Sequence, residues 1–441
     1  MGLLALRPST ARWLYLSGFL ASALVSWALR DYGAPGLKFA PALAKGCGPG
    51  PSSSGGAAAS LLSFSSTAAQ RACLGKSAVL RVAFGSAVFF AAHSLGLLCV
   101  ARAGDPRLLL HTGCPPLQLA AWAALAGSGF ALPAAAVSGF GHVARIGAGL
   151  FVLLQSLILL EFVFSVNSFL VERSEEGSRA ASALLVLGSF VLFGAALAGL
   201  VILFVFWAPR ASCSLSTLVL AETLVGILAF TAVSLAPCRQ KAAGLFTSAA
   251  MAAWTVYLSW GALASLPPGF ACAPREALLL VSSSSSSSGS SGSGRMRTNG
   301  SVLALRIASL VVTLLSLCYA TFSASGSHAA LSTANAAERG QANRETKRDT
   351  DDDAEGDAEL SYRPDFFHAT FALAACYLAM ILVSWSWASS SSTSEDPGGS
   401  LLVVDRSMAS FGVRFASLIL SQVLYLAALL APAVCTGREF D

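Results

Sequence analysis

The sequence predicts an all-α, polytopic membrane protein with about ten transmembrane helices. Of the 441 residues, 55% are hydrophobic and only 12% are charged, whereas an ordinary soluble domain carries about 25% charged residues. So few charges cannot cover a water-exposed surface, and the composition excludes a water-soluble enzyme, a disordered chain and a collagen-like chain. The formal net charge of +5 is too small and too scattered to indicate nucleic-acid binding.

Ten apolar segments have the length of about 20 residues that a helix needs to cross the hydrocarbon core. None alternates with a period of two over ten residues, which excludes an outer-membrane β-barrel. The first segment follows Arg7 and Arg12, and a cleaved signal peptide is the alternative interpretation of it. The length of its apolar run favours a retained membrane span. The predicted spans are Trp13–Leu29, Val79–Val100, Leu117–Val137, Ile146–Phe169, Ala180–Trp207, Leu215–Leu235, Leu245–Leu266, Val302–Phe322, Phe366–Trp387 and Phe411–Val434.

The distribution of Lys and Arg in the short loops predicts that the amino terminus is cytosolic. With an even number of spans both termini are then cytosolic, and the protein is an integral multi-pass protein of an endomembrane or the plasma membrane. This topology puts Cys47, Cys73, Cys213 and Cys272 outside, in an oxidising compartment. We expect Cys47 to pair with Cys73, which flanks the same loop, and Cys213 and Cys272 form a second candidate pair. Asn299, in the only N-x-S/T sequon, is a glycosylation candidate.

Two loops differ from the rest of the chain in composition. Residues 282–300 form a Ser/Gly-rich loop that is predicted to be flexible. Residues 323–361 are predicted to form an acidic, disordered cytosolic loop, in which nine acidic and four basic residues between Glu338 and Glu359 give a net charge of −5. Binding of a cation by Asp351–Asp353 is the alternative to a purely solvated, disordered loop.

Motifs for catalysis are missing from the sequence. It contains no H-E-x-x-H, no Asp-His-His-Cys string, no Gly-rich phosphate loop and no Cys/His spacing typical of a metal site. We therefore expect no enzymatic activity, no cofactor and no metal. The more informative residues are the ionisable side chains Glu161, Glu222 and Arg81, because a charge at the bilayer centre costs about 2.5–3.5 kcal/mol. We expect Glu161 and Glu222 to line a polar pathway. The alternatives are a structural ion pair, with Arg81 as the candidate partner, or a protonated carboxyl that is hydrogen-bonded to a neighbour.

Several segments resemble the Serinc (serine incorporator) family of membrane proteins. The run from Ser361 to His368, followed by Phe371, Leu373-Ala374, Tyr377, Met380 and Ser384-Trp385, is similar to the family's S-Y-x-F-F-H stretch and the helix after it. Other similar segments are the terminal Arg438-Glu439-Phe440-Asp441, the run Thr255–Trp260, Asp105-Pro106-Arg107 with His111-Thr112-Gly113, Ser9–Arg12 at the entry to the first span, and Asn167 after Glu161. The chain departs from the family in lacking the Cys cluster before the first span and in its Ser/Gly insertions.

The resemblance implies a single Serinc-like transmembrane domain over residues 1–441. It implies ten helices in two bundles tied by a long diagonal helix around the fourth span, and an oligomer in some members. Family members are associated with serine incorporation into phosphatidylserine and sphingolipids, and some move phospholipids between leaflets without ATP. The implied partners are membrane phospholipids, serine-lipid synthesis enzymes and further copies of the chain, with no nucleic acid.

The favoured hypothesis is passive phospholipid scrambling linked to serine-lipid metabolism, with Glu161, Glu222, Arg81 and Asn167 as lipid-pathway candidates. A secondary transporter of serine or another small polar solute is the first alternative, but the spans lack paired helix interruptions in two halves. A scaffold for serine-lipid synthesis enzymes is the second alternative. A membrane enzyme is less favoured because no positioned nucleophile or base stands out.

Overall fold

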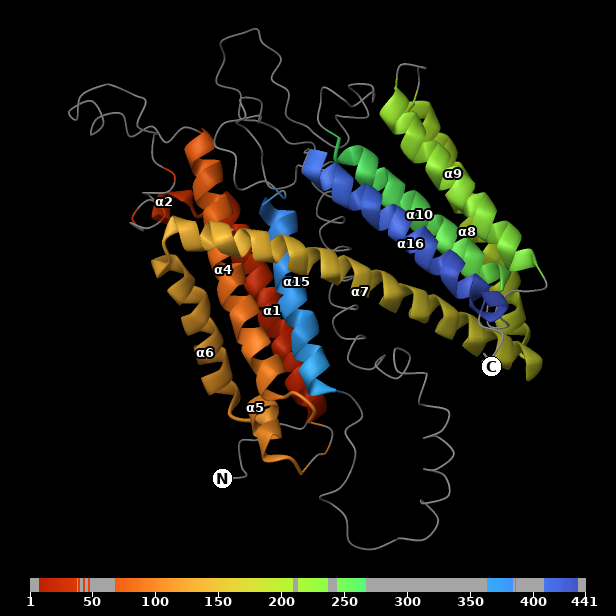
Figure 1. Cartoon of the computed structure of the whole chain (residues 1–441). Helices are drawn as coiled ribbons and strands as arrows, with labels where there is room; N and C mark the ends of the chain where they lie inside the picture. The colour runs from red at the N-terminus through yellow and green to blue at the C-terminus, as the bar shows by residue number, and fades with distance from the viewer. Residues whose placement is uncertain are drawn as a thin grey trace, which may run out of the picture. The chain divides into compact units, whose positions relative to one another are not determined.

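The computed structural model describes residues 8–37, 39, 43, 47, 68–100, 102, 104–208, 213–236, 244–266, 363–383, 385 and 408–434. Within these residues every regular element is a helix, and no β-strand occurs (Figure 1). The predicted span 302–322, the loops 282–300 and 323–361, Cys272 and Asn299 lie outside the described residues. The chain forms two compact units, unit 1 from Met1–Phe151 with Ser309–Leu401 and unit 2 from Val152–Ala308 with Leu402–Asp441.

Six of the described helices are long and apolar enough to cross a membrane. They are α4 (Ala68–Gly96), α7 (Ala134–Glu175), α8 (Arg179–Trp207), α9 (Ser214–Leu235), α15 (Pro364–Val383) and α16 (Met408–Val434). Large apolar side chains such as Leu187, Phe190 and Val191 on α8 are exposed. Exposed apolar surface of this kind is typical of a face in contact with lipid.

Unit 1 is built around α4, which packs against α1 (Pro8–Asp31), α6 (Pro115–Ser128) and α15. Tyr15 near the start of α1, His93 near the end of α4 and His368 near the start of α15 lie together, with ring centroids 4.7–6.0 Å apart. The helices α1 and α15 therefore run in the same direction and α4 runs opposite to them, as Figure 1 also shows. The first residues of α1 and of α15 therefore lie at the same end of unit 1.

The third predicted span is wrong at its carboxyl end. The helix α6 stops at Ser128, a 3-10 turn follows at Gly129–Ala131, and Val137 belongs to the next helix, α7. Leu132 is extended, with φ −67° and ψ 139°, because the ring of Pro133 disfavours helical geometry in the residue before it. Hydropathy does not reveal this break, since the apolar run continues through it. The two helical pieces have 14 and 3 residues and a combined length of about 27 Å.

The helix α7 has 42 residues and a length of about 63 Å, roughly twice the thickness of a hydrocarbon core. It includes the whole predicted span Ile146–Phe169. Its carboxyl end is a Schellman motif, in which the Gly177 and Ser178 N–H groups donate to the Ser174 and Arg173 carbonyls. Gly177 has φ +90°, a conformation that glycine adopts without strain, and the Ser178 hydroxyl then caps α8.

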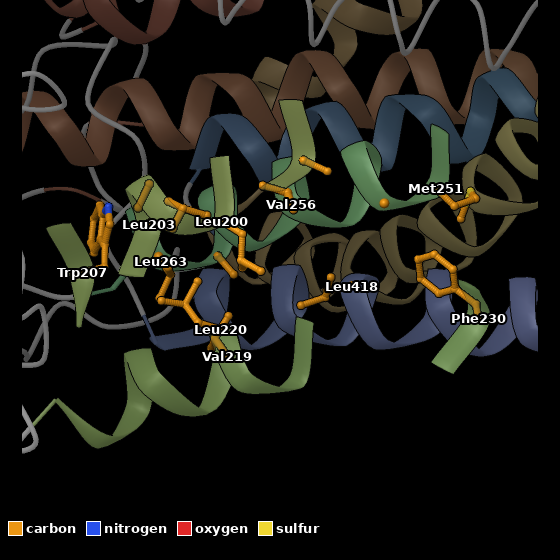
Figure 2. Packing of buried hydrophobic residues seen from close by; sticks show 14 of the residues in the cluster. Leu200, Leu203, Trp207, Val219, Leu220, Phe230, Met251, Val256, Leu263 and Leu418 are labelled. Carbon is orange, nitrogen blue, oxygen red and sulfur yellow. The ribbon is translucent and has the colours of Figure 1, made fainter. Parts of the chain in front are cut away.

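Unit 2 contains α8, α9, α10 (Leu245–Ala264), α16 and the second part of α7. Its hydrophobic core includes Leu200 and Leu203 of α8, Leu220 of α9, Val256 of α10 and Leu418 of α16, which Figure 2 shows side by side. On α9 the buried side chains recur three or four residues apart, so one stripe of that helix faces the core. The stripe consists of Ser216, Val219, Leu220, Thr223, Gly226, Phe230 and Ser234.

Candidate functional site

Buried polar side chains connect the helices of unit 2 along the length of α10. Toward the end of α10, the Thr223 hydroxyl of α9 and the Ser259 hydroxyl of α10 are 2.5 Å apart. Each oxygen also lies within hydrogen-bonding distance of a backbone carbonyl one turn earlier in its own helix. Because a hydroxyl has a single hydrogen, one of the two donates to the other hydroxyl and the second donates to its carbonyl. Near the start of α10, the Tyr425 hydroxyl of α16 lies 2.9 Å from both the Thr247 and the Ser248 hydroxyls.

Between these two groups the helices α9 and α16 approach very closely. Gln422 of α16 is 4% exposed and lies directly against Gly226 of α9, where a Cβ atom would fall 1.9 Å from the Gln422 Oε1 atom. Only glycine admits the amide at this position. The Gln422 Nε2 atom is buried and has no hydrogen-bond partner.

Glu222 lies one helical turn before Gly226, about 6 Å along α9. Its side chain is half-buried, and its Oε2 atom is buried without a hydrogen-bond partner. Leaving a buried polar atom unsatisfied costs about 1–3 kcal/mol, and more for a charged group. The helices α9 and α16 thus present an unsatisfied acceptor and an unsatisfied donor one turn apart, and this arrangement can accept a water molecule or a polar ligand group.

Asn167 of α7 marks the other end of this polar region. Its side chain is 3% exposed, and its Oδ1 atom would lie 3.1 Å from a Cβ atom on Gly244, the residue before α10. From Gly244 to Ser259 the polar groups extend about 22 Å along α10, most of a hydrocarbon core of about 30 Å. We define the polar seam as these residues of unit 2: Asn167, Glu222, Thr223, Thr247, Ser248, Ser259, Gln422 and Tyr425.

Glu161 belongs to unit 2 as well, and it lies in the interior of α7, 14 residues before its end. The side chain is half-buried and has an interaction within the structure. Six residues separate it from Asn167, which corresponds to a rotation of about 240° around the helix. The two side chains therefore occupy different faces of α7, and Asn167 faces the seam.

Arg81 belongs to unit 1 and is completely buried. Its guanidinium donates to the Leu132 carbonyl at 3.2 Å and to the Ser77 carbonyl at 3.2 Å, and it also contacts the Ser77 hydroxyl. Gly129 packs against the Arg81 carbonyl, where a Cβ atom would lie 2.4 Å from the oxygen. Arg81 thereby fastens α4 to the connection that precedes Pro133. The other three pathway candidates all lie in unit 2.

The comparison with known proteins identifies the family. A family model described as "Serine incorporator (Serinc)" matches residues 6–438. The chain belongs to the serine incorporator family. It is 26% identical over 407 residues to serine incorporator 3 of Mus musculus, covering 85% of this chain and 83% of that protein. It is 28% identical over 329 residues to a probable serine incorporator of Dictyostelium discoideum, covering 71% of each chain.

Membership of the serine incorporator family, together with the six long apolar helices, makes this chain an integral membrane protein. The family resemblance also predicts a long helix around the fourth span, and α7 is that helix. A serine incorporator of Macaca fascicularis, serine incorporator 5, is 26% identical over 395 residues, with 83% of this chain and 88% of that protein covered. The similarity therefore extends over most of each chain.

The cysteines of this serine incorporator family member form the bond expected from the sequence. Cys47 and Cys73 are joined by a disulfide, with their Cα atoms 5.8 Å apart. Cys213 is also disulfide-bonded, while its expected partner Cys272 lies outside the described residues. The described cysteines Cys99, Cys114 and Cys376 are free thiols.

Sequence reasoning identified Asn167 and Glu222 and missed the other members of the seam. Ser, Thr, Gln and Tyr are common in membrane helices, and a single one carries little information. A usable signal is the spacing of Ser216, Thr223 and Gly226 on α9, because these small or polar residues all fall on one stripe. The matching positions on α16 become apparent only when the two helices are seen to pack, since Gln422 and Gly226 are 196 residues apart in sequence.

Proposed function

We propose that this protein handles membrane lipids by moving phospholipids passively between leaflets, without ATP, and that this movement is linked to serine incorporation into phosphatidylserine and sphingolipids. The observation that carries the proposal is the unsatisfied Glu222 carboxyl oxygen on α9, one helical turn before Gly226, together with the Gln422 amide, which packs against Gly226 and has an unsatisfied nitrogen. The names of the relatives, serine incorporators, support the link to serine.

The physical basis is the contrast between the seam and the outer faces of unit 2. A phospholipid headgroup crosses the hydrocarbon core at a high cost because its charges lose water. The ammonium group of a headgroup offers Glu222 an opposite charge, and the phosphate offers Gln422 an acceptor. Exposed apolar side chains such as Val225 and Leu228 on α9 provide the surface against which acyl chains remain in the bilayer.

We also propose ten spans in two bundles, with both termini in the cytosol. The shared end of unit 1 at which α1 and α15 begin supports this topology, because it requires an even number of crossings between them. The proposed ligands are membrane phospholipids, and the proposed partners are serine-lipid synthesis enzymes and further copies of the chain. Lipid movement of this kind requires no catalytic residue.

The test is leaflet exchange of a labelled phospholipid in liposomes that contain equal amounts of wild type, Glu222→Gln or Glu161→Gln protein. Glutamine keeps the shape of the side chain and removes its charge. We expect Glu222→Gln to slow exchange about tenfold, the effect of losing roughly 1.4 kcal/mol of differential stabilisation, and Glu161→Gln to have a smaller effect.

The matched control is Glu172→Gln, a glutamate in the last turn of α7 with an exposed side chain. Exchange in this variant should equal that of the wild type. An unchanged rate in Glu222→Gln, with the variant present at the same density in the liposomes, would remove this carboxyl from the pathway.

A further inference from the structure

A buried cluster of three histidines lies in unit 1, away from the polar seam. His111, in the short helix α5 (Leu109–Thr112), and His368 of α15 are both 0% exposed, and His93 of α4 is 8% exposed. The His111 Nδ1 and His368 Nε2 atoms are 2.9 Å apart, across 257 residues of sequence. Four separate segments meet here, because the Tyr15 ring of α1 stacks on His111 and its hydroxyl donates to the His111 carbonyl.

The short N···N distance requires one shared proton. Two imidazole nitrogens at this distance form a hydrogen bond only when one carries hydrogen and the other accepts it. The remaining His368 nitrogen, Nδ1, is buried and has no partner. His93 does not satisfy it, because the His93 Nδ1 atom is hydrogen-bonded to the Phe89 carbonyl at 2.9 Å.

In the part of the chain that the structure describes, aromatic rings pack against the pair, and the acidic side chains Asp365 and Asp105 already have hydrogen-bond partners. The rings of Phe90 and Phe367 pack against the pair, and Phe371 packs against Phe367. Asp365, less than one turn before His368, accepts hydrogen bonds from the Arg363 guanidinium and the Phe366 N–H. On α1 the nearest ionisable groups in sequence are Arg12 and Tyr15 itself.

The connection between α4 and α5 adds three charges, Arg102, Asp105 and Arg107, of which Asp105 and Arg107 bind each other. The Arg107 guanidinium donates to both carboxylate oxygens of Asp105 and to the Leu98 carbonyl. These hydrogen bonds lower the pKa of the Asp105 carboxyl. Asp105 is therefore ionised throughout the range in which histidine titrates, and its charge is already paired with Arg107. Cys99 and Cys114 are the free thiols of this region.

We propose that the His111–His368 pair is a proton-operated latch that fastens the segment Leu97–Thr112 to the start of α15. A single added proton leaves an imidazolium N–H that still donates to the neutral ring. When both rings are protonated, both facing nitrogens carry hydrogen, which removes the hydrogen bond and places like charges next to each other. The latch then opens, and α5 separates from α15 when the compartment at this end of unit 1 becomes acidic. The inference is independent of the lipid pathway in unit 2.

The latch is tested by hydrogen exchange of the full-length protein in nanodiscs. The informative variant is the double substitution His111→Asn with His368→Gln, because the two amides reproduce the hydrogen-bonding positions of Nδ1 and Nε2 and do not titrate. After correction for the intrinsic effect of pH, wild-type amides in Leu97–Thr112 should exchange at least about tenfold faster at about pH 5.5 than at about pH 7.5. The double variant should change less than about twofold over the same interval.

The matched control is His142→Gln, which removes an exposed histidine on α7 and should respond to pH as the wild type does. An equal pH response in the wild type and the double variant would overturn the latch. If the double variant does not fold, nitrogen-15 histidine spectra of the wild type decide the question. Protonation of the pair must then coincide with faster exchange of the segment, and protonation without opening, or opening without protonation, would contradict the proposal.

Discussion

At the scale of single residues, the close approach of Gly226 to Gln422 determines how α9 and α16 pack. A methyl group on Gly226 would collide with the Gln422 amide, so Gly226→Ala should destabilise the protein by about 1–3 kcal/mol, the usual cost of overpacking. The measurement is thermal unfolding in detergent. Gly194→Ala is the matched control, because a Cβ atom at Gly194 on α8 meets no atom within 4 Å, and its midpoint should not fall.

Tyr425 provides a second test of the seam at this scale. Its hydroxyl lies 2.9 Å from the hydroxyls of both Thr247 and Ser248, so Tyr425→Phe removes two hydrogen bonds and leaves the ring in place. We expect a loss of about 1–2 kcal/mol of stability, measured by thermal unfolding. Tyr257→Phe, at a tyrosine that is 40% exposed, should lose little. A loss of equal size in the two variants would show that the Tyr425 hydroxyl contributes nothing specific.

Ionisable residues in apolar segments are easy to recognise in the sequence, whereas their hydrogen-bond partners and packing are not. Glu222 is conspicuous because its charge lies in an apolar run, but its unsatisfied oxygen depends on packing between helices that are distant in sequence. Arg81 is equally conspicuous, and the structure shows it bonded to the Leu132 carbonyl at the end of the α6 connection. The histidine pair joins two motifs, His111-Thr112-Gly113 and Phe366-Phe367-His368, whose proximity no local pattern reveals.

At the scale of elements, hydropathy predicts the existence of helices well and their ends less well. The predicted spans Ala180–Trp207 and Leu215–Leu235 agree with α8 and α9 to within one residue at each end. The third span fails because the break at Leu132-Pro133 is a conformational effect within an uninterrupted apolar run. The length of α7 also exceeds its predicted span, since membrane helices can continue past the hydrocarbon core.

The disulfides make a prediction about the connection between α1 and α4. Cys47 and Cys73 are 26 residues apart, and closing a loop of this size contributes about 3–4 kcal/mol in the chain-entropy description. Replacing both by serine should lower the unfolding midpoint, whereas Cys114→Ser, at a free thiol, should leave it nearly unchanged.

Peptide mapping without reduction should in addition recover Cys213 linked to Cys272. Recovery of Cys272 as a free thiol would contradict the second pairing, and the first pairing would remain as the structure shows it.

At the scale of the whole molecule, the topology can be tested by labelling. We expect epitope tags at the amino terminus and within residues 323–361 to be protected in intact cells and accessible after permeabilisation. Both positions lead into helices that begin at the same end of unit 1, and the charge distribution predicts that this end is cytosolic. Detection of only one of the two tags on intact cells would contradict an even number of crossings between α1 and α15.

Composition alone predicts a multi-pass membrane protein, because its low charge content leaves no other folded class. The division into two units depends on long-range packing and is expected only through the family resemblance. The proposed lipid pathway depends on a few polar atoms in unit 2, and these become visible as a seam only when α9, α10 and α16 are assembled.

The central claim, passive phospholipid movement, is tested most directly with purified wild-type protein in liposomes without ATP. Exchange of a leaflet-labelled phospholipid and uptake of radiolabelled serine are measured side by side, with protein-free liposomes as the reference. The account predicts lipid exchange well above the reference and serine uptake equal to it. Serine uptake without lipid exchange would contradict the account and favour a transporter, and the absence of both activities would remove scrambling and leave a scaffolding role.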